Sequence, residues 1–506
     1  MIMRNANVAN GDPVVSSLRA CAMIAVALLT LTILSVETIN PEIAELWSMN
    51  HGVKDLKDLF HKYTNYSGGW YRPSAFFLYY QLITGIVTWY DLRVFQIFTL
   101  GLHFLNAYLI TVLSSQVFGS CAKERLVLFI LVSTNPLSYI TLYQADGFDY
   151  LYQIFGTSVL ISSIALLKGN FVSQHTTLDA TFLGLSIAFL FALALTSKEQ
   201  SISYAMVAAY LVFHFRKSIP SDNFGFRCAF AIAFISIALQ VSLWFYYIAL
   251  RVPPSSGAYR TNLNLTAIGT NLNHWFQWSW RLNFVTLHDY SDMHNDVASN
   301  VPTLILLACL LVFLARTFLL KRGDEKSKVR LVLVAASILS IFPLVFGGFP
   351  WHFIAVSNLT AVLLARATVS VIRENAENAF FASTLYWALA IGVLTTAVVG
   401  IRLERDTSRA VIVRTIPALL QSTRNLTVQT QRVYYSTGPF GANLWPFSRG
   451  NAFSYALRDP AIVAINLPPG EKCNSKAPIG DLCFDYVAVD GHVELVRAAH
   501  VGPTIH

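Results

Sequence analysis

Charged side chains are scarce in this sequence. Asp, Glu, Lys and Arg make up 13% of its 506 residues, whereas 55% of the residues are hydrophobic. A soluble globular protein carries roughly 25% charged residues, so this chain has too few to solvate a globular surface of its size. The scarcity excludes a soluble protein and predicts one that lies largely in lipid.

Cysteine is scarce as well, with six residues and no metal-binding spacing. Cys21, Cys228 and Cys309 lie in apolar blocks and Cys121 in a short loop. By contrast, Cys473 and Cys483 share one polar segment near the C-terminus. A disulfide between those two would place the segment in an oxidising compartment. Internal repeats and low-complexity tracts are absent too.

Long apolar runs are what the sequence does have. Windows of about 17 to 23 residues without a fixed charge are each long enough to cross a bilayer. A cleaved signal peptide is the alternative for the first of them, but no small-residue cleavage site follows Val36. The net charge of +8 comes from Lys and Arg in short loops, where it indicates orientation rather than nucleic-acid binding. The clearest windows are 20–36, 228–250, 297–315, 331–350 and 382–400.

The basic loops predict the topology, because Lys and Arg favour the cytoplasmic side. Simple alternation fails if both 75–90 and 94–118 cross, since the basic run 321–330 would then lie outside. We therefore expect 74–89 to be a membrane-dipping or buried helix of the first outer loop, 38–93. The prediction is an all-α polytopic membrane protein with about eleven transmembrane helices, the N-terminus inside and the C-terminus outside.

Two outer regions are expected to be structured. Within the first outer loop, apolar residues recur at helical spacing over 53–63 with lysines on other faces, which favours an interfacial helix over a plain solvated one. A second long outer loop, 251–296, is rich in Asn, Trp and His and could cap a site. The polar tail has short β-prone runs at 461–466 and 486–489. We expect a membrane module over 1–400 and a small α/β outer domain over 401–506.

The few acids at the ends of spans are the candidates for chemistry, since a carboxylate there is costly without a partner or a task. One outer pocket could combine a carboxylate base with cations that hold a lipid phosphate. Glycosyl transfer from a phosphate-linked donor needs both groups. An interfacial anchor or an ion pair is the alternative for each residue alone. The candidates are Glu37, Glu42, Asp146, Asp149, Glu199, Lys198, Arg72 and His103. His103 lies about one turn from Asn106 on one predicted helix, and a structural role for the two, in bonding to a neighbouring helix, is favoured over a role in the site.

Several short motifs, in their order and spacing over about 17–215, resemble the C-type superfamily of membrane glycosyltransferases. The motifs are Trp70-Tyr-Arg-Pro-Ser74, Leu102-His-Phe-Leu-Asn106, Asn135-Pro136 and Ser197-Lys-Glu199, behind an acid that directly follows the first span. The closest resemblance is to the protein O-mannosyltransferase-like branch. The superfamily also includes lipid A aminoarabinose transferases and oligosaccharyltransferase catalytic subunits.

The resemblance implies an inverting transfer from a polyprenyl-phosphate-linked sugar to an acceptor on the periplasmic or lumenal face. It assigns the catalytic base to Glu37, although the family usually has Asp there. It matches Asp146 and Asp149 to a second acidic turn, and Lys198 to a lysine near the donor phosphate; Arg72 would assist. The acceptor, whether protein, lipid or polysaccharide, stays open, and so does the sugar.

Other readings remain beside this one. The segment 288–296 has His and Asp residues at close spacing, but a polar loop is favoured over a metal site, and no cofactor or nucleic acid is expected. A lipid or solute transporter would place polar residues near mid-membrane in paired halves. A catalytically silent scaffold would keep the fold without the usual Asp. A bacterial inner membrane, with the site on its periplasmic face, is the expected location.

Overall fold

The structure of the protein is a computed structural model. It describes residues 13–34, 74, 92–135, 138, 148–168, 176–216, 223–251, 264–280, 301–320, 323–346, 350–375, 383–388, 391, 394, 432–436, 463–467, 471, 482–489 and 492–497.

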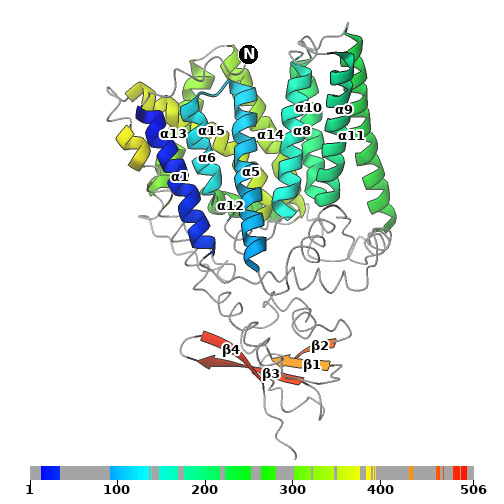
Figure 1. Cartoon of the computed structure of the whole chain (residues 1–506), viewed down its shortest axis with the longest axis vertical. Helices are drawn as coiled ribbons and strands as arrows, with labels where there is room; N and C mark the ends of the chain where they lie inside the picture. The colour runs from blue at the N-terminus through cyan, green and yellow to red at the C-terminus, as the bar shows by residue number, and fades with distance from the viewer. Residues whose placement is uncertain are drawn as a thin grey trace, which may run out of the picture.

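Long helices side by side form the body of the protein (Figure 1). Seven of them are long and apolar enough to cross a membrane. The chain is therefore an integral, multi-pass membrane protein, as its composition predicts; the count of eleven spans stays a prediction. The helices are α1 (Pro13–Leu34), α5 (Leu92–Phe118), α6 (Ala122–Ser133), α8 (Phe148–Leu167), α9 (Thr177–Ser197), α10 (Ile202–Phe215), α11 (Phe224–Arg251), α12 (Leu265–Trp280), α13 (Val301–Leu319), α14 (Asp324–Phe346) and α15 (Ile354–Asn375), with short 3-10 helices η3 (Glu199–Ser201) and η5 (Pro350–Phe353).

Small residues allow neighbouring helices to approach closely. A Cβ atom built on Gly184 of α9 would lie 2.5 Å from the carbonyl oxygen of Ala229 in α11, so only glycine fits at that contact. On Gly156 of α8 it would lie 2.6 Å from the ring of Tyr204 in α10. Without a hydrophobic driving force in lipid, such close backbone packing is a main source of helix association. The two glycines thus allow close contact of α9 with α11 and of α8 with α10.

Basic residues gather at one end of the bundle, as the topology predicts. Arg366 of α15 donates to Glu325 of α14 and to Glu124 of α6, at distances of 2.6 to 3.1 Å. Lys168, just after α8, donates to the backbone oxygen of Gln116 near the end of α5. These contacts bring the ends of five helices together, and we call this the basic end. That it faces the cytoplasm remains a prediction.

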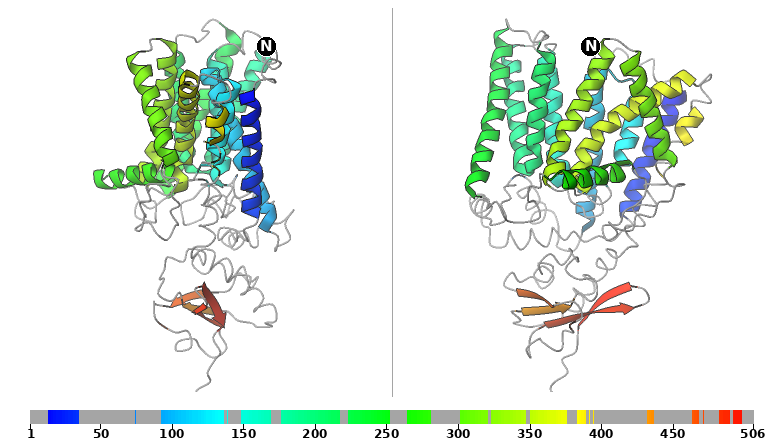
Figure 2. Two further views of the ribbon diagram at one scale, coloured as in Figure 1. Left: turned by 90° about the vertical axis from the view of Figure 1, so that its left-hand side faces the viewer. Right: turned by 180° about the vertical axis from the view of Figure 1, so that it is seen from behind.

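The opposite end of the bundle lies beside α12 and faces the C-terminal strands. Figure 2 shows α12 lying across this end rather than along the bundle. Its Asn271 amide donates to the backbone oxygen of Leu344, near the end of α14, at 3.0 Å. The helix falls within 251–296, which was expected to lie outside. We call this the outer end.

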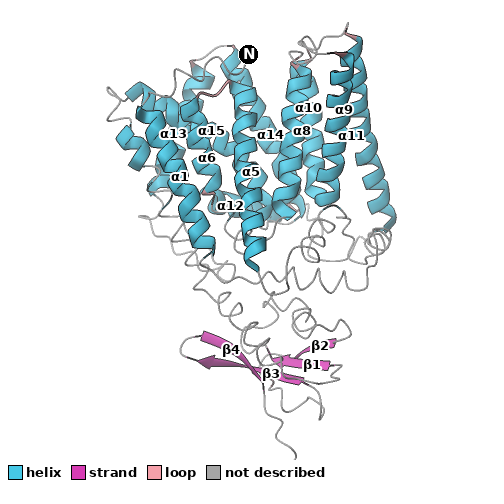
Figure 3. Cartoon of the chain, viewed as in Figure 1, coloured by secondary structure: helices cyan, strands magenta, loops and turns pink. Residues whose placement is uncertain are grey.

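The tail forms a four-stranded sheet beyond the outer end (Figure 3). Its strand order is β2-β1-β3-β4, with β1 parallel to both neighbours and β3 antiparallel to β4. The β-prone run 486–489 lies in β3 and the described part of the run 461–466 lies in β2. The helices expected in this domain concern residues outside the described ones. Cys483 is disulfide-bonded; its predicted partner, Cys473, is also outside them, and the other four cysteines are free. The strands are β1 (Arg432–Ser436), β2 (Val463–Leu467), β3 (Leu482–Val489) and β4 (His492–Arg497).

Candidate active site

A buried ion pair lies near the outer end of the bundle. The ammonium group of Lys198 donates to Oδ1 of Asp149. Their side chains are 4% and 1% exposed, so water does not screen the pair. Lys198 also lies over the ring of Tyr152, 5.7 Å from its centroid, which adds a cation–π contact. The sequence placed both charged residues at one outer side, and in the structure they form this pair.

Local sequence explains why both charges lie where helices begin or end. Asp149 is in the first turn of α8, where the helix dipole stabilises a carboxylate. Lys198 lies in extended conformation between α9 and η3, with φ −160°. Just before Lys198, the hydroxyls of Thr196 and Ser197 donate to the carbonyl oxygens of Ala192 and Leu193, both at 2.6 Å. Such bonds from Ser and Thr to the preceding turn slightly destabilise a helix and often bend it, so the local sequence favours an end of α9 here.

A cluster of buried amides supports the turn that carries Asp149. Gln153 donates to the backbone oxygen of Asp149 and accepts from Asn106 of α5 and Asn358 of α15, each at 3.2 Å. Asn358 accepts in turn from Asn135, at 3.3 Å. The amide cluster, Asn106, Asn135, Gln153 and Asn358, therefore ties α5, α8, α15 and the end of α6 together beneath the ion pair. The sequence alone did not single out Gln153 or Asn358 as site residues.

His103 is a structural residue in this arrangement. Its imidazole is 1% exposed, lies 2.8 Å from the backbone oxygen of Ser133, and contacts the ring of Tyr150 edge-on. Since Asn106 donates to Gln153 of α8, both side chains bond α5 to neighbouring helices.

Several side chains near the ion pair, Asn106 of the amide cluster among them, bury polar atoms that make no hydrogen bond within the described part of the chain, and two of these side chains lie in the pair or next to it. One is Asp149, through its Oδ2 atom; the other is Gln200, through both amide atoms, and Gln200 is only 4% exposed. A buried polar atom without a partner costs about 1–3 kcal/mol. Both therefore have capacity for a polar ligand. Glu199 starts η3 and is partly exposed.

The remaining predicted site residues, Glu37, Glu42, Arg72 and Asp146, lie outside the described residues. Ser74, two residues after Arg72, is a described residue of the first outer loop that contacts the end of α9 close to Lys198. Its hydroxyl lies 2.6 Å from that of Thr196 at the end of α9. Within the described ranges, no three His, Cys, Asp or Glu side chains form a group that could hold a metal ion.

Comparison with known proteins found solved structures that are similar to this one. No protein-family model and no curated protein sequence matches the chain. ArnT from Cupriavidus metallidurans, in the apo state, matches with a TM-score of 0.54 and 11% identity, over 93% of this chain and 92% of that one. The apo oligosaccharyltransferase of Archaeoglobus fulgidus matches with a TM-score of 0.52 and 12% identity, over 91% of this chain. The chain has the C-type glycosyltransferase fold.

At these identities the likeness concerns the C-type fold alone. This chain spans 65% of the length of the archaeal oligosaccharyltransferase. Solved structures with the same fold include the archaeal enzyme with an inhibitory peptide and a dolichol-phosphate, and ArnT bound to undecaprenyl phosphate. The likeness to the O-mannosyltransferase branch remains a prediction.

Proposed function

We propose that this protein is an inverting glycosyltransferase, which transfers a sugar from a polyprenyl-phosphate-linked donor to an acceptor at the outer end of the bundle. The buried pair of Lys198 and Asp149 carries the proposal. A buried cation beside partner-free polar atoms suits an anionic, hydroxylated ligand. Two proteins with the same fold have been solved with polyprenyl phosphates, and these are the donor class we infer here.

The reaction needs a base and a stabilised leaving group. A carboxylate removes the proton of the acceptor nucleophile as that atom attacks the anomeric carbon from the face opposite the phosphate. The bond between the anomeric carbon and the phosphate oxygen breaks, its electron pair stays on the phosphate, and the configuration at the carbon inverts. Positive charge beside that oxygen lowers the barrier, because charge develops there in the transition state.

Lys198 is our candidate for holding the donor phosphate. One of its three N–H donors serves Asp149, which leaves donors for phosphate oxygens. The role of Asp149 is then to orient the ammonium group, supported by Gln153 at its backbone. The free Oδ2 atom of Asp149 would accept from a sugar or acceptor hydroxyl. The base remains assigned to Glu37, and Arg72 would assist at the phosphate, near the contact of Ser74 with Thr196.

The test is turnover of a polyprenyl-phosphate sugar by the purified full-length protein in lipid nanodiscs. Glu37→Gln and Lys198→Met should each reduce donor consumption at least about 100-fold, the usual effect of removing one group that stabilises the transition state. Lys326→Gln is the matched control, since Lys326 lies at the basic end and donates to the backbone oxygen of Phe318. Full activity of Lys198→Met would refute the phosphate role. No donor consumption by the unmodified protein with any donor tried would favour a silent scaffold or a transporter.

The same proposal includes the membrane in which the protein lies and the face on which its site opens. If the basic end faces the cytoplasm, as Lys and Arg distribution favours, the site opens to the periplasm or to its equivalent. A bacterial inner membrane fits this arrangement. The acceptor, a protein, lipid or polysaccharide, then approaches from outside, beside α12 and the C-terminal sheet.

A further inference from the structure

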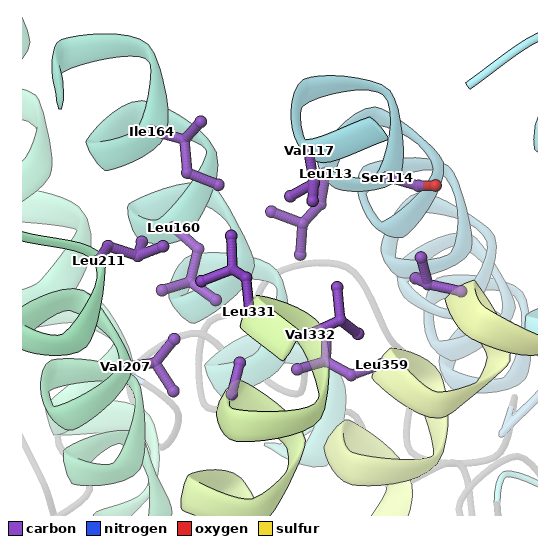
Figure 4. Close-up of a pocket in the computed structure, with 12 residues that line it drawn as sticks. Leu113, Ser114, Val117, Leu160, Ile164, Val207, Leu211, Leu331, Val332 and Leu359 are labelled. Carbon is purple, nitrogen blue, oxygen red and sulfur yellow. The ribbon is translucent and has the colours of Figure 1, made fainter. Parts of the chain in front are cut away.

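The helix α12, which lies across the outer end, leaves apolar side chains exposed. Leu265 and Leu272 are 84% and 47% exposed. Apolar side chains inside the bundle are covered instead. Figure 4 shows Leu113, Val207 and Leu331 converging from three helices on a small interior hollow, and all three are buried. The exposed leucines of α12 therefore belong to a surface that this chain does not cover.

Two different faces of α12 are open. Leu265, Ile268 and Leu272 follow one another by three and four residues, the spacing of one helix face. Thr266 and Thr270, four residues apart, share another face and are exposed as well. Because an α-helix has about 3.6 residues per turn, Thr270 lies roughly 160° around the axis from Leu272. The helix is thus amphipathic, with an apolar face nearly opposite a polar one.

The polar face of α12 carries no fixed charge. The helix contains no Asp, Glu, Lys or Arg, and its polar residues are Thr, Asn, Gln, Ser and one His. Many amphipathic helices at membrane surfaces have basic residues on the polar face, which add attraction to anionic lipids. For α12 that contribution is missing, so any affinity for a membrane comes from the burial of its apolar face.

The position of α12 indicates what covers this face. Asn271 donates to the backbone oxygen of Leu344 at 3.0 Å, and Leu344 is the last residue but one of the span Asp324–Val345. The helix thus packs against the outer end of a spanning helix. In the left view of Figure 2 it extends sideways past its neighbours. A helix in this place lies at the boundary between water and the lipid that surrounds the bundle.

We propose that α12 is an interfacial helix that lies in the plane of the membrane. The face of Leu265, Ile268 and Leu272 inserts among the acyl chains of the outer leaflet, and the face of Thr266 and Thr270 meets water. Its partner is the apolar layer just beneath the headgroups, whatever their charge. Inserted in this way, α12 holds the segment between α11 and α13 at the membrane surface. The proposal does not depend on the proposed function.

The test is site-directed spin labelling of the full-length protein in nanodiscs of phosphatidylcholine. The four free cysteines are replaced by alanine, and a label is attached through Leu272→Cys or Thr270→Cys. Collisions with oxygen, which concentrates among acyl chains, and with a water-soluble nickel chelate report the depth of each label. The label at Leu272→Cys should lie about 5–10 Å inside the boundary between headgroups and acyl chains. The label at Thr270→Cys, the matched control on the same helix, should lie on the water side.

A carboxylate added to either face gives a second measurement. With the label at Leu265→Cys, Leu272→Glu should move the label toward water, because a charge among acyl chains is costly. Thr270→Glu adds the same charge to the polar face and should leave the depth unchanged. Melting temperatures of all variants show whether a change of depth comes from misfolding.

Three results would overturn the proposal. Equal access of the nickel chelate to the labels at Leu272→Cys and Thr270→Cys would place α12 in water. Protection of both labels from nickel, with access to oxygen, would place the whole helix inside the hydrocarbon. An unchanged depth of the label at Leu265→Cys in a stably folded Leu272→Glu variant would show that the apolar face is not inserted.

Discussion

Substitutions in the buried ion pair should affect the stability of the protein and its sugar transfer differently. Lys198→Met keeps most of the side-chain volume and removes the charge. It leaves the carboxylate of Asp149, which is 1% exposed, without its cation. Breaking a buried pair by removing one partner costs about 3–5 kcal/mol, because the remaining charge is uncompensated. The single variant should therefore unfold well below the unmodified protein.

The double variant Lys198→Met/Asp149→Asn should recover most of that stability. Neither charge remains, and replacing both partners of a buried pair with neutral groups is often neutral or even stabilising. The assay is thermal unfolding of each variant in the same nanodiscs, with Asp149→Asn alone completing the cycle. Sugar transfer should be absent in the single and the double Lys198 variants alike, because the phosphate has lost its cation in both.

Two results would refute this reasoning. If Lys198→Met and the double variant unfold at the same temperature, the carboxylate is not held in a buried pair. If the double variant is stable and transfers sugar at the normal rate, the pair is purely structural, and the phosphate site lies elsewhere.

Three more predictions concern the packing of the helix bundle. Asn358→Leu removes the hydrogen bonds to Gln153 and Asn135, so the free energy of unfolding, measured by thermal unfolding, should fall by about 1–3 kcal/mol. An unchanged melting temperature would mean that these hydrogen bonds do not stabilise the fold. Gly184→Ala forces α9 and α11 apart, and a loss of about 1–3 kcal/mol in the same assay is expected, whereas Gly101→Ala, which meets nothing within 4 Å, should cost far less. Arg366→Gln leaves two glutamates at the basic end without their cation, and chemical denaturation should show a loss of about 1.5–3 kcal/mol; equal stability would contradict the bridging role of Arg366 between three helices.

Apolar blocks predicted the spanning helices because length and apolarity are what a bilayer selects. The block at 228–250 lies within α11, and 20–36 overlaps α1 up to Leu34. The structure extends some helices beyond their apolar part, as in α14, which begins at Asp324 rather than near Leu331. A helix continues into its charged flank because its backbone bonds are internal and basic side chains reach the interface. Apolarity alone therefore underestimates where such helices begin.

The sequence predicted that Asp149 and Lys198 lie at one side of the membrane, because both are charges at the ends of apolar spans, but it did not predict that the two side chains pair. The amide cluster was not predicted. Gln153 and Asn358 are 205 residues apart, and a single amide inside an apolar helix gives no sign of the residue that it will bond. The only local signal was a polar residue within a span, which generally requires an internal partner.

We propose above that Lys198 binds the phosphate of a polyprenyl lipid at the outer end. This role is tested by the affinity of the purified protein for undecaprenyl phosphate, measured without any sugar. Loss of one charge-assisted bond costs about 1.5–3 kcal/mol, so Lys198→Met should bind at least tenfold more weakly, while Lys326→Gln binds normally. Equal affinities of Lys198→Met and the unmodified protein would contradict the claim.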